Sequence, residues 1–315
     1  MSSSPSLSAE RDYARLARHP LRFWLATRPA FLSLTFCALW PGLAAAHRSL
    51  LPALPMLLAG CMLALLTHAA VNVINDVADE DNGCDAMNRD RVFPFTGGSR
   101  FIQNGVLSRD GMKRLALLLF CLVAAGGLAL VAVAGAPLLY IGLTGVGLGW
   151  AYSAEPLKLN SRGLGEVSVA VCFWLIPLGM VALAGGVLSP AVLASGISVG
   201  CLASALLYIN QFPDRAADRA AGKWHWVARL PTRSARWGYP LLTGAGYGWL
   251  AIATEAGILP VAALTGMVTL PLTMVAAYRL WRDHDRPARL APAIILTIAA
   301  ANLHPLALAA GLWFG

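Results

Sequence analysis

The chain has 315 residues, of which 57% are hydrophobic and only 13% are charged, and its mean hydropathy is +0.63. This composition excludes an ordinary soluble globular domain, in which apolar and charged residues are more evenly balanced. The net charge of +8 lies mostly in the segments that also hold the carboxylates, which argues against nucleic acid as a partner and suits anionic lipid headgroups or a phosphorylated substrate.

Apolar runs of about 20 residues, the length that crosses a bilayer as a helix, recur along nearly the whole sequence. They predict an all-α, polytopic membrane protein with nine transmembrane helices. Residues 1–22 are a polar, basic N-terminal segment, and residues 23–315 are expected to form a single transmembrane domain. The predicted spans are 24–46, 51–73, 114–134, 136–153, 164–186, 189–209, 238–256, 258–280 and 292–314.

Basic residues predict the orientation of these spans. Of the 24 Lys and Arg residues, all except Arg48 lie in the N-terminal segment, in the connections after even-numbered spans, or at their edges. Cytoplasmic loops of membrane proteins carry this excess of positive charge. We therefore expect an integral protein of the inner (cytoplasmic) membrane with its N-terminus in the cytoplasm and its C-terminus on the far side.

The second predicted span leads directly into an acidic cluster. Five carboxylates lie between Asp76 and Asp85, and such a cluster needs a counter-charge. Asn75 and Asp79 are four residues apart, so they share a face if the helix continues this far. Both lie on the side predicted to be cytoplasmic.

Basic side chains follow on the same predicted side. The long connection 83–113 contains Arg91 and the segment Thr96-Gly-Gly-Ser-Arg100, which offers backbone N–H groups, hydroxyls and a guanidinium to an anion. The connection after the fourth span adds Lys158 and Arg162. These residues are candidates for binding phosphate oxygens.

A second acidic motif follows the sixth span. Asn210, Asp214 and Asp218 repeat the four-residue spacing, and two carboxylates one turn apart repel one another unless a positive charge lies between them. Pro213 predicts a kink or break that turns Asp214 toward a cavity. Acidic oxygens without histidine or thiolate partners suit a hard cation, and Mg²⁺ shared with a phosphate is the usual case.

Other polar residues are given structural explanations. We expect Glu166, at the start of an apolar span, to pair with Arg162 one turn earlier, and His225 to be solvated at the membrane interface. His68, Asn302 and His304 lie at membrane depth, where hydrogen bonding between helices is expected.

The two acidic motifs, each after an even-numbered span, resemble those of the UbiA superfamily of intramembrane aromatic prenyltransferases. The resemblance covers roughly residues 25–315, and Tyr152–Leu159, Arg162–Glu166 and Asp218–Lys223 are similar to its 1,4-dihydroxy-2-naphthoate prenyltransferase branch. Gly83 stands where the commonest form of the first motif has its last acid, and Asp85 follows two residues later. Trp224-His225-Trp226 also departs from that branch.

This resemblance implies a transmembrane prenyltransferase domain whose helices surround a central cavity, with a polyprenyl diphosphate and an aromatic acceptor as substrates within the lipid bilayer. It implies Mg²⁺ as cofactor, held by Asp76, Asp79, Asp85, Asp214 and Asp218, of which all except Asp85 are expected to be catalytic. Residues implied to bind the diphosphate are Asn75, Asn210, Arg91, Arg100, Lys158 and Arg162. Departure of pyrophosphate leaves an allylic cation that the acceptor ring attacks, and menaquinone-type quinone biosynthesis is the implied pathway.

Two alternatives stay open. A different acceptor, such as 4-hydroxybenzoate, a chlorophyllide, haem, homogentisate or a glycerol phosphate, would use the same mechanism, because acceptor specificity depends on cavity shape. A membrane transporter is the alternative from another class, because intramembrane carboxylates and broken helices also mark transport paths. Against a transporter, the acids gather at one face, and no chain of ionisable residues crosses the predicted bundle.

Overall fold

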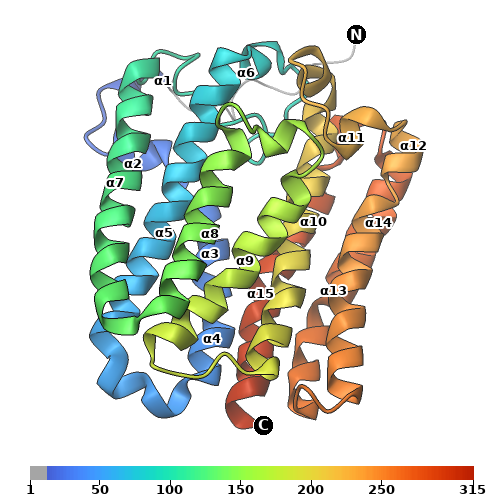
Figure 1. Ribbon diagram of the computed structural model, residues 1–315. Helices are drawn as coiled ribbons and strands as arrows, with labels where there is room; N and C mark the ends of the chain where they lie inside the picture. The colour runs from blue at the N-terminus through green and yellow to red at the C-terminus, as the bar shows by residue number, and fades with distance from the viewer. Residues whose placement is uncertain (1–12) are drawn as a thin grey trace.

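The computed structural model describes residues 13–315, and this part of the chain is a bundle of helices (Figure 1). The elements are, in chain order, α1 (Tyr13–Ala17), α2 (Arg22–Ala26), α3 (Pro29–Ala38), α4 (Trp40–Ala45), η2 (His47–Ser49), α5 (Leu50–Asp81), α6 (Cys84–Met87), α7 (Arg109–Ala134), α8 (Ala136–Ser153), η3 (Leu159–Ser161), α9 (Gly165–Leu183), α10 (Pro190–Ala220), α11 (Trp226–Arg229), α12 (Thr232–Ala235), α13 (Gly238–Glu255), η4 (Val261–Thr269), α14 (Leu270–Asp283), η5 (Pro287–Arg289) and α15 (Ala291–Phe314).

Within residues 13–315, six segments are long and apolar enough to cross a membrane as helices: α5, α7, α9, α10, η4 with α14, and α15. The other three predicted spans correspond to α3 with α4, which is a shorter apolar helix, and to α8 and α13, which have 18 residues each and are not among the six. The all-α, multi-pass class is therefore confirmed, whereas nine membrane crossings remain a prediction.

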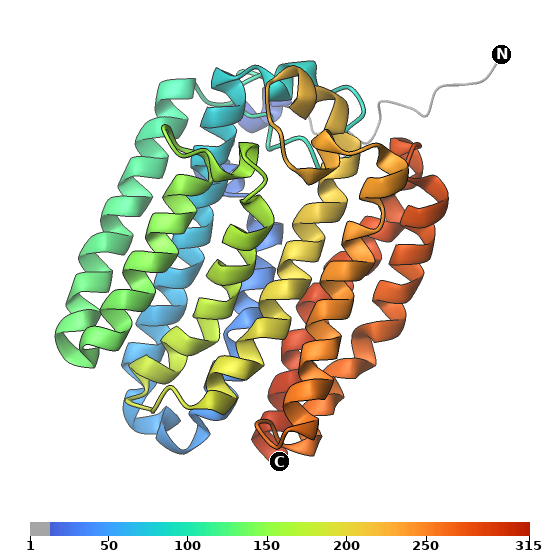
Figure 2. The same ribbon diagram turned by 45° about the vertical axis from the view of Figure 1, so that its right-hand side comes forward.

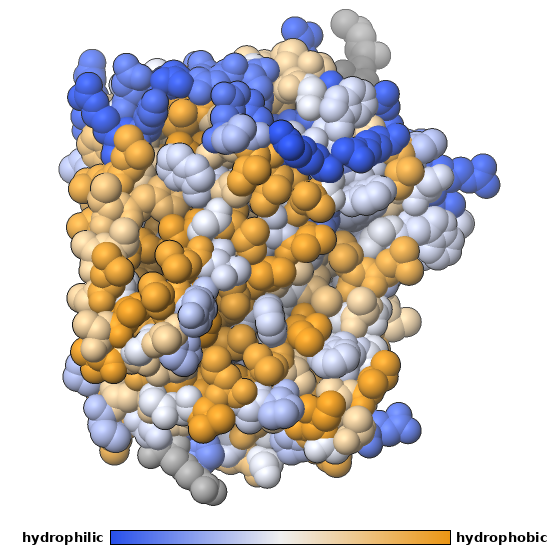
Figure 3. Space-filling view, in the orientation of Figure 1, coloured by the Kyte–Doolittle hydropathy of each residue, from blue (hydrophilic) through white to orange (hydrophobic). Residues whose placement is uncertain are grey.

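The surface has the two zones that a membrane protein needs. Figure 3 shows hydrophilic residues gathered at the end of the bundle where α1, α6 and α11 lie, and a broad, mainly hydrophobic zone around the long helices. Large side chains of the long helices that do not line the internal cavity are exposed: Leu118 of α7 is 56% exposed and Met274 of α14 is 62% exposed. Such exposure is costly in water and favourable against lipid chains.

Two predicted spans differ from the structure at their starts. The predicted span 24–46 is interrupted, because α2 ends at Ala26, Arg28 adopts a left-handed conformation (φ 56°), and α3 begins at Pro29. Proline at the first position favours a helix start, because its fixed φ suits the helix and its missing N–H would lack a partner there. The predicted span 258–280 begins as the 3₁₀ segment η4 and becomes α-helical only at Leu270.

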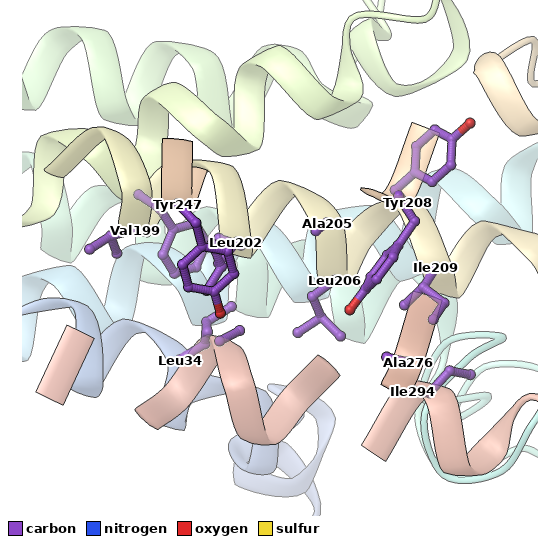
Figure 4. Packing of buried hydrophobic residues seen from close by; sticks show 14 of the residues in the cluster. Leu34, Val199, Leu202, Ala205, Leu206, Tyr208, Ile209, Tyr247, Ala276 and Ile294 are labelled. Carbon is purple, nitrogen blue, oxygen red and sulfur yellow. The ribbon is translucent and has the colours of Figure 1, made fainter. Parts of the chain in front are cut away.

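Helix α10 lies at the centre of the packing. Of its most apolar stretch, 78% is buried, compared with 6% for α5. Leu202, Leu206 and Ile209 of α10 pack with Leu34 of α3 and Ile294 of α15 (Figure 4). Helix α10 holds Asp214 near one end and is itself held on several sides, so it gives the second acidic motif a rigid support.

Short turns return the chain so that both acidic motifs reach the same end of the bundle. Helix α7 turns into α8 at Gly135 (φ 81°), and α9 turns into α10 through Gly185 (φ 70°), where the chain reverses direction. As a result, the carboxyl-terminal ends of α5 and α10 lie together beside α6 and α11 (Figures 1 and 2). Helix α10 runs through Pro213 to Ala220, so the predicted break at this proline does not occur.

Candidate active site

A cavity of about 770 Å³ opens among the helices below this end of the bundle. Its walls combine side chains of both acidic motifs with a larger apolar surface deeper between the helices. Apolar lining residues include Leu63 and Val71 of α5, Val131 of α7, Leu139 and Leu143 of α8, and Phe173 of α9. The cavity can therefore hold a ligand that is charged at one end and hydrocarbon along the rest.

The first motif presents one face of α5 to the cavity. Asn72, Asn75 and Asp79 all line it, and Asn75 Nδ2 donates to Asp79 Oδ2 at 2.7 Å. Asn75 and Asp79 therefore share a face, as their spacing predicts. Asp85, from the short helix α6, lines the same cavity.

Asp76 has a different environment. It is only 2% exposed, it forms a short ion pair with Arg28, and it accepts hydrogen bonds from both the hydroxyl and the backbone N–H of Ser99, the latter at 3.2 Å. It is not among the residues that line the cavity. In this structure Asp76 holds Arg28, at the junction of α2 and α3, and the 88–108 loop against α5.

The second motif faces the first across the cavity. Asn210, Asp214 and Asp218 all line it. Asp214 accepts hydrogen bonds from Asn88 Nδ2 at 2.6 Å and from the backbone N–H of Gly97 at 3.3 Å. The 88–108 loop thus connects the two motifs, with Ser99 bound to Asp76 and Asn88 bound to Asp214.

Lys223 joins the motifs directly. Its Nζ lies 2.5 Å from Asp79 Oδ1 and 3.3 Å from Asp218 Oδ1. Burial alone would lower the pKa of Lys223, but the two carboxylates outweigh burial and hold this pKa well above its ordinary value. A charged ammonium group therefore lies between the motifs, supplying the positive charge that the acidic spacing requires.

His225 is buried against the second motif, which corrects the expectation that it is solvated. It is 3% exposed, and its Nε2 lies 3.0 Å from Asp218 Oδ2. The backbone N–H of Ala228 donates to Nδ1, at the start of α11. Because Nδ1 accepts this bond, Nε2 carries the proton and donates to Asp218.

Two adjacent glycines allow the 88–108 loop to approach the carboxylates. Gly97 and Gly98 both have positive φ (74° and 69°), and a Cβ at Gly98 would lie 2.5 Å from Asp85 Oδ2. A side chain at Gly98 would therefore displace Asp85. Burial and the nearby charge of Asp79 raise the pKa of Asp85 well above its ordinary value.

The four basic residues predicted to bind diphosphate do not line the cavity. Arg162 donates to the carbonyl of Pro156 at 2.7 Å, and Lys158 pairs with Glu155 at 2.6 Å, both near the surface. Arg100 donates to the carbonyl of Asn88 at 3.2 Å and so supports the loop. The fourth, Arg91, packs over the Phe93 ring, with its guanidinium carbon 5.8 Å from the ring centre.

Arg28 and Lys223 line the cavity instead, and sequence reasoning gave neither of them a role. A signal was present for Arg28, because an arginine inside a predicted span needs a partner. A signal was also present for Lys223. It follows Asp218 by only five residues, and the acids of this motif need a positive charge nearby. The expected pairing of Glu166 with Arg162 is also wrong, because Gln211 Nε2 donates to Glu166 Oε1 at 2.9 Å.

The site has the chemistry of a cation site but not a preformed geometry for one. Within residues 13–315, no three acidic, histidine or cysteine side chains are grouped closely enough to hold a metal ion. The carboxylates are engaged by amide, hydroxyl and cationic donors. Their charge nevertheless exceeds what Arg28 and Lys223 neutralise, and their donor atoms are oxygens. This donor set fits a hard divalent cation, provided that the carboxylates exchange some of their present partners.

The fold and the site together define an all-helical membrane protein in which two acidic motifs meet at the polar end of an apolar cavity. Residues 34–299 match the model of the UbiA prenyltransferase family. Because this match covers most of the chain, the protein belongs to the UbiA prenyltransferase family and is an enzyme of that family.

Characterised relatives carry names from naphthoate metabolism. The chain is 31% identical to a 1,4-dihydroxy-2-naphthoate octaprenyltransferase of Escherichia coli (strain K12), covering 92% of this chain and 94% of the relative. It is 26% identical to a 2-carboxy-1,4-naphthoquinone phytyltransferase of Synechocystis sp., covering 76% of this chain and 75% of the relative.

Solved structures share the fold at lower identity. A digeranylgeranylglyceryl phosphate synthase superposes with a TM-score of 0.62 at 14% identity, covering 97% of this chain and all of that one. A UbiA homolog from Archaeoglobus fulgidus bound to GPP and Mg²⁺ superposes with a TM-score of 0.59 at 15% identity, covering 92% and 99% of the two chains. These likenesses show the fold alone.

Proposed function

We propose that this enzyme transfers a polyprenyl group from a polyprenyl diphosphate to 1,4-dihydroxy-2-naphthoate, in a Mg²⁺-dependent step of menaquinone biosynthesis. One observation carries the proposal: both acidic motifs meet around Lys223 at the polar end of an apolar cavity. A diphosphate with a long hydrocarbon tail matches this division of the cavity. The 31% identical relative supports the choice of acceptor.

The cavity carboxylates Asp79, Asp85, Asp214 and Asp218 are the proposed Mg²⁺ ligands. Asp76 does not line the cavity, and we assign to it the positioning of Arg28 and Ser99. When bound, Mg²⁺ neutralises diphosphate oxygens and makes pyrophosphate a better leaving group. The Archaeoglobus fulgidus homolog bound to GPP and Mg²⁺ supports this cofactor for a related protein.

The positive side chains of this chain have a separate task. Arg28 and Lys223 line the cavity, and we assign to them the binding of diphosphate oxygens that remain uncompensated. Asn75 and Asn210 line the cavity as well and are suited to orient the diphosphate through their amides. Arg91, Arg100, Lys158 and Arg162 contact loop residues instead, so we assign them to loop support and surface charge.

The apolar part of the cavity holds the prenyl chain and keeps water from the reacting carbon. Loss of pyrophosphate leaves an allylic cation, which water would quench and an electron-rich ring attacks. A new carbon–carbon bond then forms at the ring, and with a carboxylated acceptor the carboxylate leaves as carbon dioxide. Substrate, cation and product all remain within the bundle.

We further propose that the enzyme crosses the inner membrane nine times and that its site faces the cytoplasm. The hydrophilic, carboxylate-bearing end of the bundle (Figure 3) and the concentration of Lys and Arg in the connections at this end support that orientation.

The test is prenyl transfer by the purified protein, with labelled polyprenyl diphosphate, a panel of aromatic acceptors, and Mg²⁺ either present or removed with EDTA. We expect product with 1,4-dihydroxy-2-naphthoate that disappears with EDTA and returns when Mg²⁺ is restored. Product with 4-hydroxybenzoate or another acceptor alone would contradict the proposed acceptor and keep the mechanism. Product formation that EDTA does not affect would contradict the role of the carboxylates.

A further inference from the structure

Two histidines lie at membrane depth, and the structure gives them different environments. His304 of α15 is fully buried, with Nδ1 3.0 Å from the carbonyl of Gly266 and Nε2 2.9 Å from Ser198 Oγ. Both ring nitrogens are therefore used in contacts between helices, as predicted. His304 is not among the cavity-lining residues and needs no further role.

In the described part of the chain, only one of the two ring nitrogens of His68, in α5, has a hydrogen-bond partner. Its Nδ1 lies 2.7 Å from Thr35 Oγ1 of α3, and Phe173 packs edge-on with its ring centre 5.9 Å away. Among residues 13–315, no side chain or backbone group hydrogen-bonds to Nε2. His68, Thr35 and Phe173 all line the cavity. A polar ring nitrogen without a partner in an apolar chamber is costly, so it points to a polar ligand group.

The position of His68 indicates which ligand would supply that group. His68, Asn72, Asn75 and Asp79 all line the cavity from the same side of α5, because residues three and four apart share a helix face. At about 1.5 Å per residue, His68 lies about 10 Å below Asn75 along the helix axis. The diphosphate stays at the carboxylates and the prenyl chain carries no polar group. Of the proposed substrates, only the aromatic acceptor brings a polar group to this depth.

We propose that His68 binds the acceptor, with Nε2 hydrogen-bonded to a hydroxyl of the aromatic ring and Phe173 packed beside that ring. Thr35 is a positioning residue, because its contact with Nδ1 orients the imidazole and determines which nitrogen is available. This inference rests on the proposed function, since it takes a hydroxyaromatic acceptor for granted.

The experiment compares wild type with His68→Phe, which keeps a ring but removes both nitrogens, and with His68→Gln, which keeps a hydrogen-bonding side chain. For each protein, KM is measured for the polyprenyl diphosphate, for 1,4-dihydroxy-2-naphthoate, and for analogues lacking one or the other hydroxyl. Asn302→Leu serves as the control, because Asn302 also lies at membrane depth, bonds only within α15 through its Nδ2, and does not line the cavity.

We expect His68→Phe to raise KM for the acceptor about tenfold, the effect of one lost hydrogen bond, while KM for the diphosphate stays within about twofold. Removal of the contacted hydroxyl should raise the wild-type KM similarly and should add little in His68→Phe, because both changes delete the same bond. His68→Gln should recover part of the loss, and Asn302→Leu should match wild type.

Equal effects of His68→Phe on both substrates, or an unchanged acceptor KM, would overturn the assignment of His68 while leaving the proposed function intact. Additive effects of the variant and of each hydroxyl deletion would also overturn it. If His68→Phe does not fold, as judged by its size-exclusion profile in detergent, the same comparison is made with His68→Gln and Thr35→Val. A wild-type enzyme that prenylates no hydroxylated ring would instead refute the proposed function, and with it this inference.

Discussion

Lys223 connects the two acidic motifs through contacts with Asp79 and Asp218. A single ammonium group between two buried carboxylates stabilises both of them. If the ammonium group is removed, the negative charges of the two carboxylates are left without compensation. In the proposed reaction the same group faces the diphosphate. A structural and a catalytic role therefore coincide at one side chain.

We predict that Lys223→Met lowers kcat/KM for the polyprenyl diphosphate roughly a hundredfold, because it removes a buried positive charge from the site of leaving-group departure. Lys158→Ala is the matched control, since its partner Glu155 is 78% exposed and such a pair contributes little. Steady-state kinetics of both variants tests this. Comparable losses in the two would show that the basic residue nearer the surface matters as much, contrary to our assignment.

Gly98 is the second residue with a specific steric demand. Gly98→Ala should lower Tm and reduce activity, because the added Cβ would meet Asp85 Oδ2 at 2.5 Å. Gly105→Ala separates this contact from backbone strain, since Gly105 has a similar φ of 66° and a Cβ there would meet no atom within 4 Å. We expect a cost of about 1 kcal/mol for Gly105→Ala from strain alone and a larger one for Gly98→Ala. Equal shifts in Tm, measured in detergent, would argue against close packing at Asp85.

At the scale of elements, the site depends on helices α5 and α10 ending side by side. Helix α10 is buried along most of its apolar length, whereas α5 faces lipid and cavity, so the two differ in how they are held. The 88–108 loop connects these two helix ends by hydrogen bonds: Ser99 donates to Asp76 of α5, and Asn88 donates to Asp214 of α10. The motifs are thus two halves of one site that only this packing brings together.

We therefore predict that Asp79→Asn on α5 and Asp214→Asn on α10 each remove most activity while the protein still inserts and folds. Both amides keep the size and hydrogen-bonding capacity of the acid and lose its negative charge, which the proposed cation requires. Asp110→Asn, on the exposed first turn of α7, is the control. Activity with and without added Mg²⁺, together with size-exclusion profiles, measures the effect. An active Asp214→Asn would refute the metal assignment.

For the whole molecule, the distribution of surface polarity sets the expected orientation in the membrane. The polar end carries α6 and α11 (Figure 3), whereas the turn between α9 and α10 lies at the opposite end (Figures 1 and 2). In a background with the six cysteines replaced, we predict that Arg162→Cys reacts with a membrane-impermeant thiol reagent only from the cytoplasmic side. Val187→Cys should react only from the opposite side. Labelling of intact cells and of inverted vesicles distinguishes these outcomes, and the reverse pattern would refute the proposed orientation.

Several features could be predicted from the sequence because they depend on local patterns. Apolar run length gives the membrane class, and residue spacing places Asn75 with Asp79 on one helix face. The break before α3 was not predicted, because hydropathy averages over Arg28 within an apolar stretch. The environment of His225 was also missed, because burial of a short segment depends on the helices around it.

The helical membrane fold and the two acidic motifs follow from the sequence alone, since periodicity and run length are properties of neighbouring residues. Which cations meet those acids depends on the tertiary structure. Arg28 reaches Asp76 across 48 positions, and Lys223 of one motif reaches Asp79 of the other. By contrast, Lys158 and Arg162 bond within their own loop. Packing of distant helices sets these distances, and no spacing along one helix encodes them.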